Sequence, residues 1–351
     1  MYVHQRPAED EGKKPAKAAR IDPTATAPAL PPSILGTAAA STKPAPLPAS
    51  AAPAPAPAPA PAALRAPDMA ARRKELGPCP ADIDSADVGD PMFCSLYVQE
   101  IYDYLREKEV MDALDCDYMT RQDNVSARMR TVLIDWMVEV QLKFRMTSET
   151  LYLSVNIVDK FLQKRKITRD SLQLLGVTAL FIAAKFEEIY SVEVNDLAYI
   201  TENACHSDEI IRFEGEVLTT IGWNLTTPCP LHFLRRYSKA AGNDGSLHTM
   251  SKYLLELSLG FYHMLKDLPS TQAAAAVLLT RHLMGTKPFW PDSVKYHSGF
   301  VEDEIVECAR AMLELVKHPD PKYHLVYRKY AGPKLCSVSR IAAENADKVS
   351  L

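Results

Sequence analysis

A single lysine at the end of an apolar run is the first candidate for chemistry in this chain. Lys185 directly follows residues 172–184, which carry no charged side chain. A membrane-spanning helix takes roughly 20 apolar residues, so this shorter run predicts a helix inside a protein core. An ammonium group buried there without a partner would cost on the order of several kcal/mol. We therefore expect Lys185 to have a partner, in this chain or in another.

An apolar stripe on a second predicted helix, at about residues 126–145, is the next candidate. Its members recur at the helical period of 3.6 residues, and the other side of this helix is apolar too. Such a stripe usually belongs to a protein core, and the alternative is a surface groove for a partner's short apolar motif. The stripe consists of Met129, Val132, Leu133, Trp136, Met137 and Val140.

Two charged residues interrupt this apolar helix. Arg130 and Asp135 lie among its apolar side chains, where a charge needs compensation. Asp159, in the next predicted helix, is the candidate partner for Arg130.

Sequence patterns of the common enzyme and metal sites are missing. The chain has no GxxxxGK[ST] or GxGxxG phosphate loop, no HExxH and no GxSxG. Its seven cysteines form no CxxC pair, and Cys229 with His232 has ligand-like spacing but no second pair. We therefore expect no metal, no cofactor and no catalytic site.

Composition divides the chain into an N-terminal arm and a globular part. Most of the 26 prolines lie in the first 91 residues, and Ala-Pro alternation at residues 52–61 favours extended polyproline II. We expect residues 1–90 to be disordered. The mildly acidic remainder argues against nucleic-acid binding. Because no apolar signal segment opens the chain, we expect an intracellular protein with reduced thiols and no membrane partner.

The globular part predicts helices, with hardly any strand alternation. After Asp90 and Pro91, apolar residues at helical spacing predict a helix that packs on the first domain. Five helices follow at about residues 126–145, 148–164, 168–187, 193–202 and 207–221, with Gly222 as a left-handed terminator. A second set is expected at about 229–241, 247–264, 269–285, 290–298 and 302–316, with a short last helix at 323–329.

The two sets of helices resemble copies of one unit. Small and apolar residues recur at matching places, so each copy is expected to be a bundle around its third helix. Lys185 aligns with His282 and Glu214 with Ala309, so only the first copy keeps this base and this acid. The pair is either a salt bridge internal to the first domain or a binding site on one repeat.

Three segments resemble the cyclin box, and most closely that of B-type mitotic cyclins. They are MRTVLIDWMVEV, LQLLGVTALFIAAKFEEIY and Arg212-Phe213-Glu214, within a similarity that covers about residues 92–330. The resemblance implies an all-α fold of two tandem five-helix cyclin-box repeats with an extra N-terminal helix. The expected divisions are a Pro/Ala-rich arm at 1–90, the first box with its preceding helix at 91–225, the second box at 226–332 and a tail at 333–351.

The resemblance also implies a function. A B-type cyclin is a non-catalytic regulatory subunit that binds and activates a mitotic cyclin-dependent kinase, helps to recruit its substrates and controls G2/M progression. By that resemblance the kinase-binding residues are Lys185, Glu214, Phe186, Ile182, Leu218, Trp223 and Leu225. A hydrophobic patch that docks Arg-x-Leu motifs of substrates or inhibitors would comprise Met129, Val132, Leu133, Trp136, Glu139 and Gln173. A structural polar network would comprise Arg130, Asp135 and Asp159.

Two further expectations concern the N-terminal arm. The family's destruction signal, RxxLxxxxN, is matched only by Arg73 and Leu76, with Ala81 where the asparagine would stand. This match is either a degron read by ubiquitin ligase machinery or a chance occurrence. Lys13-Lys14 and Arg72-Arg73-Lys74 are either nuclear-import patches or solvated charges. We expect the protein in the nucleus and the cytoplasm.

Two rival functions are compatible with a helical chain. A cyclin-fold transcription scaffold similar to transcription factor IIB would carry an N-terminal zinc ribbon and a basic second repeat, and the sequence shows neither. A helical enzyme would need carboxylates or a metal cluster that converge from facing helices, and the sequence does not indicate them. The kinase-activating cyclin is therefore the favoured hypothesis.

Overall fold

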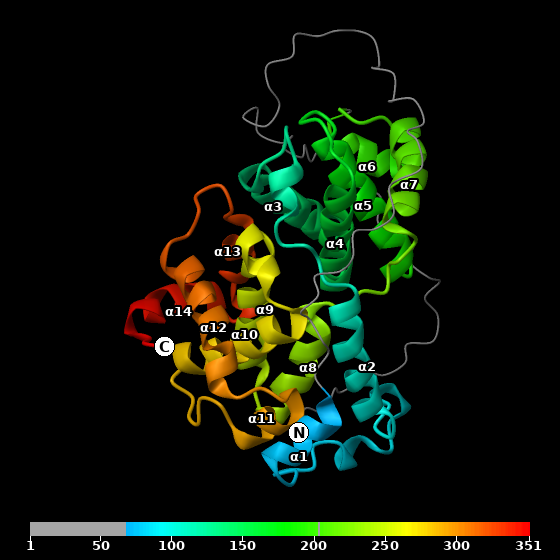
Figure 1. The fold of residues 1–351 in the computed structure, drawn as a ribbon. Coiled ribbons are helices and arrows are strands. Elements are labelled where there is room, and N and C mark those ends of the chain that lie inside the picture. Colours follow the sequence, from blue (N-terminus) through cyan, green and yellow to red (C-terminus); the bar gives the residue numbers. More distant parts are fainter. Residues whose placement is uncertain (1–67, 203) are drawn as a thin grey trace, which may run out of the picture.

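Helices are the only regular elements in the part of the chain that the structure describes, which is residues 68–202 and 204–351 (Figure 1). The structure is a computed structural model. It confirms the all-α prediction for these residues, and none of their helices is long and apolar enough to cross a membrane. Residues 1–67, which make up most of the predicted arm, lie outside the described part.

The first repeat is a bundle of five helices around its third member. Helix α5 packs against each of the other four, as the small and apolar residues of its sequence predict. Gly176 allows the closest of these approaches, because a Cβ atom there would lie 2.7 Å from Cδ1 of Leu133 in α3. The helices are α3 (Ala127–Phe144), α4 (Ser148–Lys164), α5 (Leu172–Glu187), α6 (Val194–Ile200) and α7 (Ser207–Ile221).

The second repeat follows the same plan. Its third helix, α10, packs against α8, α9 and α12, while α11 packs on α8. The helices are α8 (Pro230–Ala240), α9 (Gly245–Leu259), α10 (Pro269–Leu283), α11 (Asp292–Ser298) and α12 (Glu302–Lys317). Both five-helix sets therefore agree with the predicted order, and their ends agree to within a few residues.

Local signals in the sequence account for several of these helix ends. Ser126 caps α3 by accepting a hydrogen bond from the backbone N–H of Met129, and Thr147 caps α4 in the same way. Gly222 ends α7 with φ 72°, so the predicted left-handed terminator is confirmed.

The helix that precedes the first repeat, α2 (Val98–Met111), packs on the second repeat, so the expectation that it packs on the first domain is wrong. Its buried Glu109 accepts hydrogen bonds from the backbone N–H (2.8 Å) and the hydroxyl (2.6 Å) of Ser270, at the start of α10. Tyr102 donates to the carbonyl of His232 in α8 at 2.9 Å. Buried polar groups on α2 need these partners, and the first repeat does not supply them.

Helix α1 (Met69–Leu76) corrects the prediction that disorder extends to residue 90. Asp68 caps it by accepting from two backbone N–H groups at 3.0 Å. Arg72 then donates to the carbonyl of Gly299 at 2.9 Å and pairs with Glu304, while Arg73 pairs with Asp103 of α2. Part of the predicted basic patch is thus engaged in ion pairs. Arg73 and Leu76 lie in a folded helix rather than in a disordered arm.

The C-terminal residues are also folded beyond the expected boundary at 332. Helix α13 (Leu325–Tyr330) corresponds to the predicted short last helix, and α14 (Val338–Asn345) lies in the segment predicted as a tail. Both pack against α9, and Val338 and Ala342 are completely buried. Helix α14 is therefore part of the second unit.

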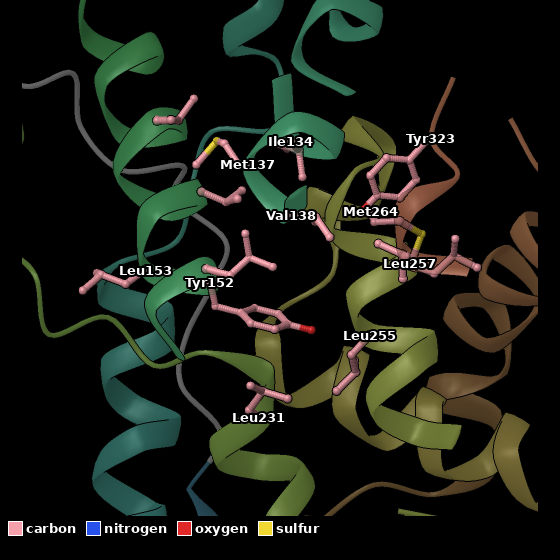
Figure 2. Close-up of a cluster of buried hydrophobic side chains, with 14 of the residues drawn as sticks. Ile134, Met137, Val138, Tyr152, Leu153, Leu231, Leu255, Leu257, Met264 and Tyr323 are labelled. Carbon is pink, nitrogen blue, oxygen red and sulfur yellow. The ribbon is translucent and has the colours of Figure 1, made fainter. Parts of the chain in front are cut away.

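The two repeats share one continuous hydrophobic core. Figure 2 shows Val138 of α3 and Tyr152 of α4 directed toward Leu255 and Leu257 of α9. All four side chains are almost completely buried. Burial of apolar area across this junction holds the repeats in one relative position.

A buried ion pair reinforces the same junction. Arg130 of α3 is fully buried and makes two hydrogen bonds of 2.7 Å to the carboxylate of Asp159 in α4, which confirms the predicted pairing. Its remaining terminal nitrogen donates across the junction to the carbonyls of Leu259 (3.2 Å) and Gly260 (3.3 Å). Tyr118 donates to the same carboxylate at 2.7 Å, and burial raises the pKa of its hydroxyl. One guanidinium thus joins three segments.

Removal of the Asp159 carboxylate is therefore expected to destabilise the whole chain. Asp159→Ala leaves a buried guanidinium without its counter-charge, so the free energy of unfolding should fall by about 3–5 kcal/mol. Asp123→Ala is the matched control, because Asp123 and Lys166 form a pair whose side chains are 68% and 62% exposed. That control should cost less than about 1 kcal/mol. Similar losses in urea unfolding of the two variants would contradict the structural role of Arg130.

Candidate functional site

Lys185 and Glu214 form an ion pair at the surface of the first repeat. The Lys185 ammonium contacts the Glu214 carboxylate and lies 4.2 Å from the centroid of the Phe181 ring. The Lys185 side chain is 42% exposed and that of Glu214 is 16% exposed. The expectation of a buried ammonium is wrong because burial ends at Ala184, and the following residues of α5 face outward. The expected partner exists, and it lies within this chain.

Packing of α5 on α7 brings the two charges together. Phe213 is buried and meets Phe161 of α4 with ring centroids 5.5 Å apart. This contact fixes the rotation of α7, so that the next residue, Glu214, points along the edge of the bundle toward the end of α5. The Arg-Phe-Glu segment therefore combines an anchor in the core with a carboxylate at the surface.

Exposed apolar side chains occur on the same two helices and in the segments that directly follow them. Phe186 is 50% exposed and Trp223 is 66% exposed, whereas Ile182, Leu218 and Leu225 are buried or packed against the core. The predicted kinase-binding residues thus divide into an exposed group and a supporting group. The sequence analysis missed three further exposed apolar residues, which are Ile189, Tyr190 and Ile211. Ile189 and Tyr190 follow the end of α5 closely, after Glu187 and its C-cap residue Glu188.

We call the pair and its exposed neighbours the Lys185 surface, defined as Lys185, Phe186, Ile189, Tyr190, Ile211, Glu214 and Trp223. Large exposed apolar side chains on elements that also carry exposed charged groups are typical of surfaces that bind another protein.

The predicted hydrophobic patch on α3 is largely closed. Leu133 is completely buried against Gly176, and Val132 and Trp136 are 7% and 5% exposed. Met129 and Glu139 are only partly buried, and burial raises the pKa of the Glu139 carboxyl. Most of the stripe is therefore core.

Gln173 and Asp135 differ in how their polar groups are satisfied. Gln173 of α5 is buried, and its amide nitrogen has no hydrogen-bond partner within the described residues. Asp135 accepts a hydrogen bond of 2.9 Å from the backbone N–H of Leu325, at the start of α13. Asp135 thus holds helices together as predicted, but separately from the pair of Arg130 and Asp159.

A second exposed apolar surface lies before and along α2, and the sequence analysis did not single it out. Its residues are 41% to 87% exposed. They are Val88, Met92, Phe93, Leu96, Tyr97, Ile101 and Tyr104. Helical spacing alone predicted a buried face here, but α2 turns its polar residues toward the second repeat.

The described residues contain no group of three or more His, Cys, Asp or Glu side chains placed to hold a metal ion. The spacing of Cys229 and His232 has a structural cause, because Nδ1 of His232 accepts a hydrogen bond of 3.1 Å from the backbone N–H of Cys229. This bond caps α8. Burial lowers the pKa of His232, which keeps the imidazole neutral and able to accept.

Comparison with known proteins identifies the family. The family model described as cyclin, N-terminal domain, matches residues 100–226, and the one described as cyclin, C-terminal domain, matches residues 228–344. Among solved structures, a viral cyclin from herpesvirus saimiri superposes with a TM-score of 0.56 at 20% identity, over 66% of this chain and 99% of that one. This similarity concerns the fold alone.

Curated relatives show which branch of this family the chain is most similar to. G2/mitotic-specific cyclin-B of Dictyostelium discoideum is 42% identical over 264 residues, which are 75% of this chain and 61% of that protein. G2/mitotic-specific cyclin-B2 of Homo sapiens is 41% identical over 271 residues, or 76% of this chain and 68% of that protein. The chain therefore belongs to the cyclin family. Its relatives are B-type mitotic cyclins, which confirms the resemblance and does not favour a transcription scaffold.

Gly215, next to Glu214 in α7, offers a test of how this surface is built. Apart from the backbone of its own helix and its chain neighbours, a Cβ atom at Gly215 would meet no atom within 4 Å, so Gly215→Ala should raise the free energy of unfolding by about 0.5–1 kcal/mol. Gly176→Ala is the matched control and should lower it, because Leu133 occupies the space. Thermal unfolding of both variants measures this. A loss of stability in Gly215→Ala would show that the residue faces a neighbour.

Proposed function

We propose that this chain is a non-catalytic regulatory subunit that binds and activates a mitotic cyclin-dependent kinase at G2/M and helps to recruit its substrates. The observation that carries the proposal is the Lys185 surface, where a paired base and acid lie on two packed helices whose ends also carry the exposed Phe186 and Trp223. The relationship to B-type cyclins over both repeats supports the same conclusion.

The exposed ion pair suits protein recognition because it is prepared for further hydrogen bonds. An ammonium has three donors and a carboxylate can accept several hydrogen bonds, so Lys185 and Glu214 can keep their mutual contact while they bind a partner. Charged hydrogen bonds at a desolvated contact contribute about 1.5–3 kcal/mol each and fix orientation. The neighbouring aromatic side chains supply apolar area.

Activation follows from differential binding rather than from chemistry by this chain. A kinase is active when its mobile helix and activation loop are correctly placed. A subunit that binds this conformation better than the inactive one shifts the kinase population toward it. The continuous core across both repeats makes the Lys185 surface a rigid template for such selection.

Reversal of the two charges tests this proposal. Lys185→Glu combined with Glu214→Lys keeps an ion pair and the fold, but it presents each charge to the wrong partner group. Loss of two charged hydrogen bonds should weaken capture of the kinase about a hundredfold or more. The measurement is the affinity of the purified chain for a mitotic cyclin-dependent kinase, together with histone kinase activity.

A neighbouring ion pair provides the control. Arg165 and Glu216 lie 3.4 Å apart with side chains 39% and 31% exposed, and Glu216 is on the same helix as Glu214. Arg165→Glu with Glu216→Arg should leave capture unchanged. If the variant with both Lys185 and Glu214 reversed captured the kinase as well as the unmodified chain does, the proposed contact would be contradicted.

Docking of Arg-x-Leu motifs is a finer part of the proposal. It is supported by Met129 and Glu139, which remain partly accessible at the edge of the α3 stripe, and by the unpartnered amide of Gln173. A carboxylate and an apolar side chain that are both accessible along one helix suit the arginine and leucine of such a motif. The buried members of the stripe support these residues from the core.

Glu139→Gln tests the docking proposal without disturbing the core. Phosphorylation of a substrate that carries an Arg-x-Leu motif should fall about tenfold in kcat/KM, since the arginine loses its counter-charge. A substrate without the motif should be unaffected. Glu344→Gln, a change at an exposed carboxylate of α14, is the control. Equal losses on both substrates would indicate a general effect on the kinase complex.

Four expectations from the sequence remain predictions. Localisation to the nucleus and the cytoplasm, recognition of Arg73 and Leu76 by ubiquitin ligase machinery, and the lack of nucleic-acid and membrane partners come from the sequence alone. Lys13 and Lys14 lie outside the described residues.

A further inference from the structure

The backbone has an unfavourable conformation just beyond the end of α7. Trp223 has φ 60°, in the left-handed region that glycine and asparagine adopt far more readily than an aromatic residue does. Its side chain is 66% exposed, so burial of the indole does little to offset the cost of this conformation. Such a conformation persists only where neighbouring contacts enforce it, and residues of this kind cluster at functional sites.

Hydrogen bonds on both sides hold the backbone of Trp223 in place. On its N-terminal side, its own N–H donates to the carbonyl of Leu218 in α7 at 2.9 Å. On its C-terminal side, Asn224 is bound twice. The carbonyl of Asn224 accepts from Nζ of Lys160 in α4 at 3.1 Å, and its side-chain amide donates to the carboxylate of Asp112 at 2.8 Å.

Lys160 and Asp112 also bind Thr227, three residues further along. The ammonium contacts the hydroxyl of Thr227, and that hydroxyl donates to the carboxylate of Asp112 at 3.3 Å. Lys160 is buried, and Asp112, the C-cap residue of α2, is paired with Lys108 at 2.7 Å. We call Asp112, Lys160, Asn224 and Thr227 the Lys160 clamp. It ties the connection between the repeats to the end of α2 and to α4.

We propose that the Lys160 clamp is a positioning device for Trp223, which keeps the indole exposed and in one orientation for contact with an apolar surface of the kinase. The inference rests on the proposed function, in which Trp223 belongs to the Lys185 surface. A side chain that is already oriented loses less conformational freedom on binding, so positioning raises affinity without a new contact. Lys160 and Asp112 are buried, so they act through Trp223 and do not touch the kinase themselves.

Fluorine NMR measures the positioning of the indole on the full chain without kinase. The chain has three tryptophans, so labelling with 5-fluorotryptophan gives three resonances, and that of Trp223 is the one lost in Trp223→Phe. Lys160→Met removes the ammonium with little change of shape, and at pH 7 it should narrow this resonance and shift it toward that of free fluorotryptophan. Lys164→Met, at an exposed lysine one turn further along α4, is the control and should leave the resonance unchanged. An unchanged Trp223 resonance in both Lys160→Met and Asn224→Ala would overturn the proposal.

A pH profile separates positioning by Lys160 from a general structural role. Burial lowers the pKa of Lys160 to about 8; the nearby Asp112 opposes this shift, whereas Lys108 and Lys164 act in the same direction. The ammonium is therefore intact below this pH and loses its proton as pH rises through it. The Trp223 resonance should change with a midpoint near pH 8 in the unmodified chain and show no such step in Lys160→Met. The same step in both chains would overturn the role of Lys160.

Affinity for a mitotic cyclin-dependent kinase shows whether Lys160 acts through Trp223. Trp223→Ala should weaken capture about tenfold or more, and Lys160→Met should weaken it about fivefold. Because the two residues act as one unit, the double variant should bind no more weakly than Trp223→Ala alone. Losses that multiply in the double variant would overturn the proposal.

The outcomes also separate this inference from the proposed function. Full capture by Trp223→Ala, together with loss of capture when the charges of Lys185 and Glu214 are reversed, would overturn the inference and leave the proposed function intact. The fluorine resonances need no kinase, so they decide whether the Lys160 clamp orients the indole even if the proposed function fails.

Discussion

The architecture depends on one guanidinium that water does not reach. Arg130 has no exposed surface, and burial of such a charge is tolerable only if it is paired and hydrogen-bonded. Asp159 takes two of its hydrogen bonds, and the backbone carbonyls of Leu259 and Gly260 take two more. These partners come from both repeats, so the arginine is satisfied in one relative arrangement of the two units. Apolar packing supplies the area of this junction, and Arg130 supplies its specificity.

The two repeats share their packing but differ at the surface. Lys185 and Glu214 meet at the exposed edge of the first repeat, whereas the aligned His282 stacks on Phe289 with ring centroids 3.8 Å apart and the aligned Ala309 is completely buried. The second repeat has thus replaced an acid and a base by contacts of its own core. The charges are therefore not a requirement of the five-helix bundle, and a role in binding explains why the first repeat alone carries them.

The sequence alone predicts the helices that local signals determine. It does not predict which residues are buried when burial depends on segments far along the chain. Apolar periodicity and caps located the ten repeat helices, and the need of a buried Arg130 for a counter-charge identified Asp159. Periodicity could not show that Leu133 is covered by α5 or that α2 turns toward the second repeat. It also did not reveal α1 or α14, because these short helices are held by contacts with residues far along the chain, such as Arg72 with Glu304.

Hydrogen–deuterium exchange of the full chain, with and without a mitotic cyclin-dependent kinase, tests the central claim most directly. The account predicts that the kinase slows exchange at the end of α5, in the segment that follows it and along α7, while backbone amides in the core of the second repeat keep their rates. Protection confined to the second repeat, or a complex that forms without protection around Lys185 and Glu214, would contradict the account.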